Sequence, residues 1–72
     1  MRAHRYRITI SGKLGEIGRE AFGDFWIESR GANTALTGDL DQAALYGALN
    51  RILTLGFDLL EVTRLAEPKL IS

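Results

Sequence analysis

The only long stretch with helical periodicity lies in the second half of the chain, at residues 40–56. Its apolar residues recur at the i, i+3, i+4, i+7 spacing that places side chains on one face of a helix. They are Leu45, Ala48, Leu49 and Ile52. Asp41 can accept from the free amides of the first turn, and Gly56 suits the left-handed position that ends a helix. We therefore expect one helix that covers one face of a sheet.

Four shorter stretches, residues 5–11, 24–29, 33–38 and 57–65, have the composition and the alternation of strands. In the first, Tyr6, Ile8 and Ile10 point toward the core, and Arg5 and Arg7 point away from it. The second places Phe25 and Ile27 inward and Trp26 and Glu28 outward, and the third places Thr34 and Leu36 inward.

The phase of the last strand is ambiguous. If Leu60 and Val62 point inward, then Leu59, Glu61 and Thr63 lie on the open face of the sheet. The opposite phase would bury Glu61 and Thr63, which costs more free energy because a buried carboxylate needs a partner. We therefore expect the first phase.

Residues 12–24 contain four glycines and favour a loop, although one irregular helical turn is an alternative, with Ile17 and Phe22 closing the edge of the sheet. The glycine spacing also suggests a phosphate-binding loop. We reject that interpretation, because there is no Gly-Lys-Ser/Thr ending and no long helix follows directly.

These elements predict one small α+β domain over residues 1–72, in the order β-β-β-α-β. A three-stranded antiparallel meander would be followed by a helical crossover that returns the fourth strand parallel to the first and beside it. The expected structure is a mainly antiparallel four-stranded sheet, in the order 3-2-1-4, with one helix packed on one face.

Composition narrows the classes of function. Nine basic and nine acidic residues give a formal net charge of zero, whereas nucleic-acid and anionic-membrane binders normally carry a basic excess. No apolar run is long enough to span a bilayer. The chain has no cysteine, which excludes a disulfide framework and makes a cytoplasmic location the simplest expectation. We expect no nucleic-acid or membrane partner.

The predicted open face of the sheet carries the main candidates for an interaction site. It presents arginines, carboxylates and threonines, which alone would form a solvated face with charge pairs across strands. Trp26 changes this picture, since an exposed tryptophan is a typical interface anchor. The interface candidates on this face are Arg5, Arg7, Trp26, Glu28 and Leu59. A shallow ligand site under Trp26 is the alternative.

Gly47 is a further interface candidate. It falls in the middle of the predicted helix, on the face away from the sheet, where glycine costs about 1 kcal/mol relative to alanine. Close approach of another backbone in a helix-to-helix dimer would explain it, and so would drift at a surface position.

No catalytic constellation is visible. His4 is the only histidine and has no second histidine to share a metal, and the serines lack a histidine and aspartate at an interpretable spacing. Capping of the helix explains Asp41 better than acid–base chemistry does. We therefore expect no catalytic residue, no metal site and no cofactor.

Residues 41–52, read together with residues 55–65, resemble the C-terminal half of a group of small bacterial proteins without an assigned activity, common in actinobacteria. That half typically reads DQAALHGLL-RIRDLGLPLLSVRRL. The resemblance implies a compact standalone domain and carries no function. The chain departs from the pattern at Tyr46, where histidine is usual, and at Trp26, where a small polar residue is usual.

Three hypotheses follow for the function. The first is a non-enzymatic protein-interaction or self-association module that uses the open face around Trp26 and Arg7, or an exposed edge of the sheet. The second is a small-ligand-binding or accessory subunit of a bacterial enzyme, with its site between residues 12–24 and the sheet. Nucleic-acid binding through an aromatic sheet surface is a weaker third.

Overall fold

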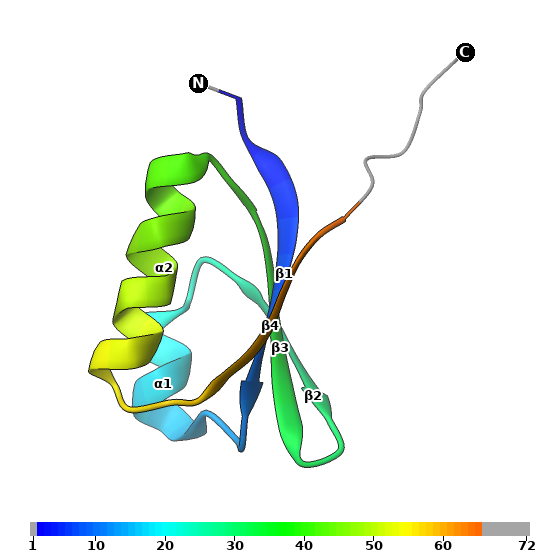
Figure 1. Ribbon diagram of the computed structural model, residues 1–72. Coiled ribbons are helices and arrows are strands. Elements are labelled where there is room, and N and C mark those ends of the chain that lie inside the picture. Colours follow the sequence, from blue (N-terminus) through cyan, green and yellow to red (C-terminus); the bar gives the residue numbers. More distant parts are fainter. Residues whose placement is uncertain (1, 66–72) are drawn as a thin grey trace.

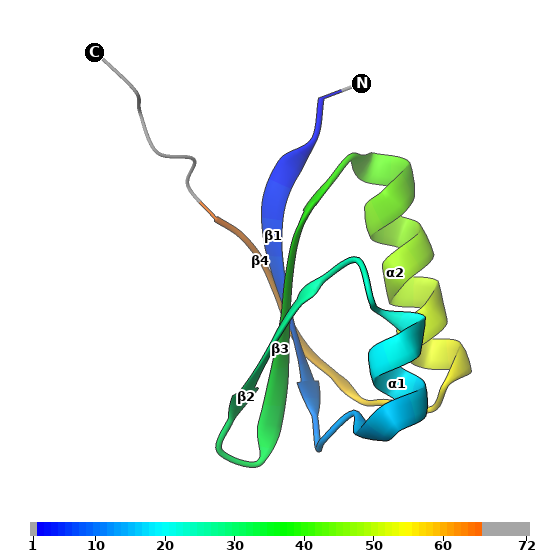
Figure 2. The same cartoon turned by 180° about the vertical axis from the view of Figure 1, so that it is seen from behind.

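Two helices lie on the same face of a four-stranded antiparallel sheet in the computed structural model, which describes residues 2–65 (Figure 1). The elements are β1 (His4–Ser11), α1 (Gly15–Ala21), β2 (Trp26–Arg30), β3 (Asn33–Leu40), α2 (Gln42–Thr54) and β4 (Leu59–Arg64). The strands are arranged in the order β2-β3-β1-β4. Turned by 180°, the fold again shows both helices on one side of the sheet and no helix on the other side (Figure 2).

The caps of α2 confirm the local signals in the sequence. Asp41 accepts a hydrogen bond from the amide of Ala44 at 2.8 Å, which satisfies one of the free donors of the first turn. At the other end Gly56 adopts a φ of 85°. This left-handed residue lets the amide of Phe57 turn back and donate to the carbonyl of Ile52 at 3.1 Å. Ala48 and Ile52 are buried against the sheet, as predicted.

The expectation of a loop at residues 12–24 is wrong, because this segment contains the seven-residue helix α1. Within the described part of the chain, no side chain caps its first turn. Its stability comes instead from packing, which is the usual case for so short a helix. Phe22, directly after α1, is fully buried and meets Phe25 edge to face, with ring centroids 5.8 Å apart. Ile17, by contrast, is 77% exposed and does not close the edge of the sheet.

The helix α1 also explains why the predicted strand order 3-2-1-4, with a single helix, is wrong. A helix between β1 and β2 carries the chain across one face of the sheet, so that β2 runs parallel to β1 and one strand position away from it. Strand β3 then fills the gap and pairs antiparallel with both. The same relation holds for β3, α2 and β4, with β1 in the gap. The result is the split βαβ arrangement of the ferredoxin-like topology.

Strand β4 lies beside β1, as expected, but runs antiparallel to it. Val62 pairs with Ile8 on the helix-covered face, and Glu61 pairs with Thr9 on the open face, which confirms the expected phase for these two residues. A bulge then shifts the register, and Leu59 pairs with the inward-facing Ile10. The prediction that Leu59 lies on the open face is therefore wrong.

The core lies between the sheet and the two helices. Ile8 pairs with Leu36 at its centre, and both side chains are fully buried. The other buried apolar members of the cluster are Ile10, Leu14, Phe22, Phe25, Leu40, Ala48 and Ile52. Thr34 is also buried, and its hydroxyl donates to the carbonyl of Gly12 at 2.7 Å, so this polar group is satisfied.

Candidate functional site

The open face of the sheet brings most of the predicted interface residues together. Register places Trp26 opposite Thr37, Thr37 opposite Arg7, and Arg7 opposite Thr63, so that four side chains form one row across all four strands. Trp26, at the β2 end of this row, is 75% exposed. The next row contains Glu28, Ala35, Thr9 and Glu61.

Charge pairs occupy part of this face. The guanidinium of Arg5 donates to both carboxylate oxygens of Asp39, at 3.0 and 3.4 Å. This hydrogen bonding, together with the nearby positive charge, lowers the pKa of Asp39 below its ordinary value. Glu28 accepts from Arg30 at 3.3 Å. These exposed pairs fit a solvated surface and add little to stability.

Arg7 differs from these paired arginines. It is half-buried between the two threonines of its row, and within residues 2–65 it makes neither an ion pair nor a side-chain hydrogen bond. Its positive charge is therefore available to a ligand or a second molecule on this face.

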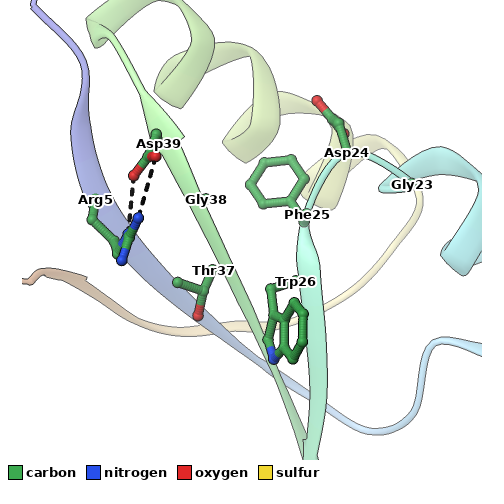
Figure 3. Close-up of a pocket in the computed structure, with 8 residues that line it drawn as sticks. All are labelled: Arg5, Gly23, Asp24, Phe25, Trp26, Thr37, Gly38 and Asp39. Atoms are coloured by element: carbon green, nitrogen blue, oxygen red, sulfur yellow. Dashed lines mark hydrogen bonds and ion pairs between the residues drawn. The ribbon is translucent and has the colours of Figure 1, made fainter.

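A shallow concavity of about 590 Å³ lies beside Trp26 (Figure 3). The indole of Trp26 and the Arg5–Asp39 pair stand on the same side of the sheet, with Thr37 between them, whereas the ring of Phe25 points toward α2. The remaining lining residues are Gly23, Asp24 and Gly38. Of residues 12–24, only Gly23 and Asp24 line this concavity. A ligand site between this segment and the sheet would therefore involve only these two residues of the segment.

Gly38 allows the ring of Phe25 to approach β3 closely. A Cβ at this position would lie 3.1 Å from Cδ2 of Phe25, closer than ordinary contact, so glycine lets Phe25 pack under β3. Gly47 has no such role. It is exposed on α2, and a Cβ there would meet no atom of the described chain within 4 Å. The helix-to-helix contact suggested for Gly47 stays a prediction.

A second surface, which includes the interface candidate Leu59, lies at the outer edge of β4. Its three large apolar side chains Leu59, Leu60 and Val62 are 39%, 52% and 38% exposed. On α2, Tyr46 is 59% and Leu53 is 65% exposed. We call these five residues the β4 edge patch. The adjacent leucines Leu59 and Leu60 were a signal for this surface, but the pattern did not show the bulge between Leu59 and Glu61.

The position of Tyr46 and Leu53 follows from the geometry of α2. They are seven residues apart and therefore lie on one flank of the helix. Arg51 lies on the opposite flank, where its guanidinium donates to the carbonyl of Ala21 at the end of α1. Tyr46 also lines a groove with Tyr6 of β1 and Arg64 of β4. The flank of Tyr46 and Leu53 thus faces away from α1 and toward β4.

His4 lies in β1, opposite Leu40, and its Nδ1 accepts a hydrogen bond from Arg64 at 2.9 Å. Residues 2–65 contain no group of three or more histidine, cysteine, aspartate or glutamate side chains arranged to hold a metal ion. Neither helix of this region has the length and apolar character needed to cross a membrane.

Comparisons with known proteins place the chain in a family. Neither the curated proteins nor the solved structures contain a match to it. A family model does match, over residues 5–63, which covers all four strands and both helices nearly in full. The chain therefore belongs to this family, which is described as a domain of unknown function (DUF8691).

Proposed function

We propose that this chain is a non-enzymatic self-association module, and that two copies pair along strand β4. The observation that carries the proposal is the β4 edge patch, which gathers five of the eight large apolar side chains that are exposed in residues 2–65. An edge strand presents unpaired backbone donors and acceptors, and apolar side chains around it make pairing with another strand favourable. Burial of such side chains is worth about 25 cal/mol per Å² of apolar surface.

Charge selects the register of the proposed pairing. Two copies related by a two-fold axis pair β4 antiparallel with itself. A register centred on Glu61 would set two carboxylates directly opposite one another, which is destabilising. A register centred on Val62 sets valine against valine on the helix-covered face, and Glu61 against Thr63 of the second copy on the open face. We therefore propose the Val62-centred register.

The bulge at Leu60 limits the length of this pairing. Because the ladder between β1 and β4 is disrupted there, regular pairing with a second copy would extend over Glu61, Val62 and Thr63. The side chains of Leu53 and Tyr46 would supply further contact from the flank of α2. In this arrangement the sheets of two copies join into one continuous sheet.

The mass of the protein in solution tests this proposal. We expect a dimer for the wild type, and a monomer for Val62→Lys, because a lysine at this position places a charge in the centre of the new contact. Ser29→Lys is the matched control, since Ser29 is exposed on the helix-covered face of the other edge strand, β2. It should stay a dimer.

Three results would contradict the proposal. They are a monomeric wild type at high protein concentration, a dimer that persists in Val62→Lys, and a dimer that is lost in Trp26→Ser but kept in Val62→Lys. The last result would move the interface to the open face, where Trp26 and the unpaired Arg7 lie.

Binding of a small ligand is the second candidate function, as an accessory subunit of a bacterial enzyme. The observation that favours it is the concavity beside Trp26. A metabolite that binds there should raise the melting temperature of the wild type and quench the fluorescence of Trp26, the only tryptophan in the chain. A metabolite panel without either effect would count against it. The absence of cysteine fits a working location in the reducing cytoplasm.

A further inference from the structure

A groove of about 460 Å³ opens between the first turns of α2 and the neighbouring ends of β1 and β4. The guanidinium groups of Arg2 and Arg64 and the imidazole of His4 line it. Two phenol rings and an amide complete most of the wall, from Tyr6, Tyr46 and Gln42. Among residues 2–65, no carboxylate lines this groove. Its lining is therefore positively charged, although the chain as a whole has no net charge.

Arg64 is held in place at the groove. Its Nη2 lies 2.9 Å from Nδ1 of His4, and since a guanidinium can only donate, the imidazole nitrogen accepts. This contact uses one of the five N–H groups of Arg64. Within residues 2–65, neither Arg64 nor Arg2 forms an ion pair with a carboxylate. Their charges are therefore available to an anion.

The neutral polar groups of the groove also present donors. Nε2 of Gln42 donates to the hydroxyl of Tyr46 at 3.2 Å, so that the phenol oxygen acts as an acceptor and its own proton can be given to a ligand. Tyr6 lies directly opposite Arg64 in the ladder of β1 and β4, on the helix-covered face. Side chains from three separate elements thus converge with hydrogen-bond donors on one space.

We propose that this groove binds a small organic anion, whose carboxylate or phosphate group meets Arg64 and Arg2 and whose body lies against the rings of Tyr6 and Tyr46. A guanidinium recognises either group through two parallel charge-assisted hydrogen bonds. The tyrosine hydroxyls and the amide of Gln42 fix the orientation of the anion. This inference does not depend on self-association, because every group involved belongs to one copy of the chain.

Titration of the ¹⁵N-labelled full chain with two probes, at constant ionic strength, tests the proposal. Inorganic phosphate represents the phosphoryl group, and benzoate represents a carboxylate on an aromatic body. At least one probe should shift the amide resonances of His4, Tyr6 and Gln42, and the stronger probe identifies the preferred group. Neither probe should shift the resonances of β2, on the far edge of the sheet.

Arg64→Gln should weaken binding of the active probe by at least about tenfold, because it removes the charged donor at the centre of the groove. Arg30→Gln is the matched control, since Arg30 is an exposed arginine on the other edge strand, and it should bind as the wild type does. Arg2→Gln, outside every strand, provides a second variant if Arg64→Gln does not fold. Titration of Val62→Lys separates loss of the dimer from loss of the anion site.

Two results would overturn the inference. One is the absence of shifts in these three amides with both probes. The other is equal binding by Arg64→Gln and Arg30→Gln, which would mean that the anions only screen surface charge.

Discussion

The two βαβ halves of the chain, β1-α1-β2 and β3-α2-β4, occupy equivalent places in the topology. They differ in how far they bury their large apolar side chains. In the first half the short helix α1 is followed by Phe22, which is fully buried, and by Phe25, which is nearly so. Arg51 covers both rings from the side, with its guanidinium carbon 5.0 and 5.9 Å from the two ring centroids. The outer strand of this half, β2, presents the paired charges of Glu28 and Arg30.

The second half has the longer helix and the better helix signals, yet it leaves its outer strand uncovered. Val62 faces the helix layer but is 38% exposed, so the helices leave this edge of the sheet partly uncovered. Natural proteins protect edge strands with charges, short strands and bulges. Strand β2 exposes one large apolar side chain, Trp26, beside the Glu28–Arg30 pair, whereas β4 exposes three, Leu59, Leu60 and Val62, and is interrupted by a bulge. The pairing that we propose would use the edge at β4 and leave the edge at β2 free.

Phe22→Ala should produce the largest effect, because it removes the buried ring that closes the first half. Truncation of a buried phenylalanine costs about 3–5 kcal/mol of unfolding free energy, a large part of what a domain of this size possesses. Urea denaturation should show a mostly unfolded protein even without denaturant. Ile17→Ala, in the same part of the fold but exposed, should change stability by no more than about 0.5 kcal/mol. Equal losses for the two variants would contradict the description of α1.

Single cysteines should distinguish the two edges more finely, since the natural chain has none. In the Val62-centred register the two copies of residue 62 face each other directly, with Cα atoms about 4.5–5.5 Å apart, which is within the range of a disulfide. Val62→Cys should therefore form a covalent dimer on mild oxidation, seen on a non-reducing gel. Trp26→Cys, on β2, should stay mostly monomeric under the same conditions. Faster cross-linking through residue 26 would reverse the assignment of the two edges.

The sequence allowed the second half of the fold to be predicted much better than the first. The start and end of α2 depend on local chemistry, namely the carboxylate of Asp41 and the left-handed backbone of Gly56, and such signals are readable without knowledge of the fold. Helix α1 has no comparable signal. It forms because Leu14 and Phe22 enter the core, and the strand order changes with it.

The candidate sites likewise contain some residues that the sequence predicted and others that it did not. Alternation placed Arg5, Arg7, Trp26 and Glu28 on one face, because a strand with one buried side has a fixed phase. The position of Leu59 and the β4 edge patch depend on a bulge and on how far α2 reaches across the sheet. The groove depends on the pairing of Tyr6 with Arg64, which only the antiparallel direction of β4 produces. These are properties of tertiary structure that alternation alone does not encode.

Hydrogen exchange at the two edge strands, measured at low and high protein concentration, tests the central claim most directly. Pairing of β4 with a second copy would satisfy its outward-facing amides, so that their exchange slows as the protein is concentrated. We predict that the outward-facing amide of Val62 gains protection with concentration, while the amides of β2 exchange at an unchanged rate. Protection that does not change on either strand, or that rises on β2 instead, would contradict the account.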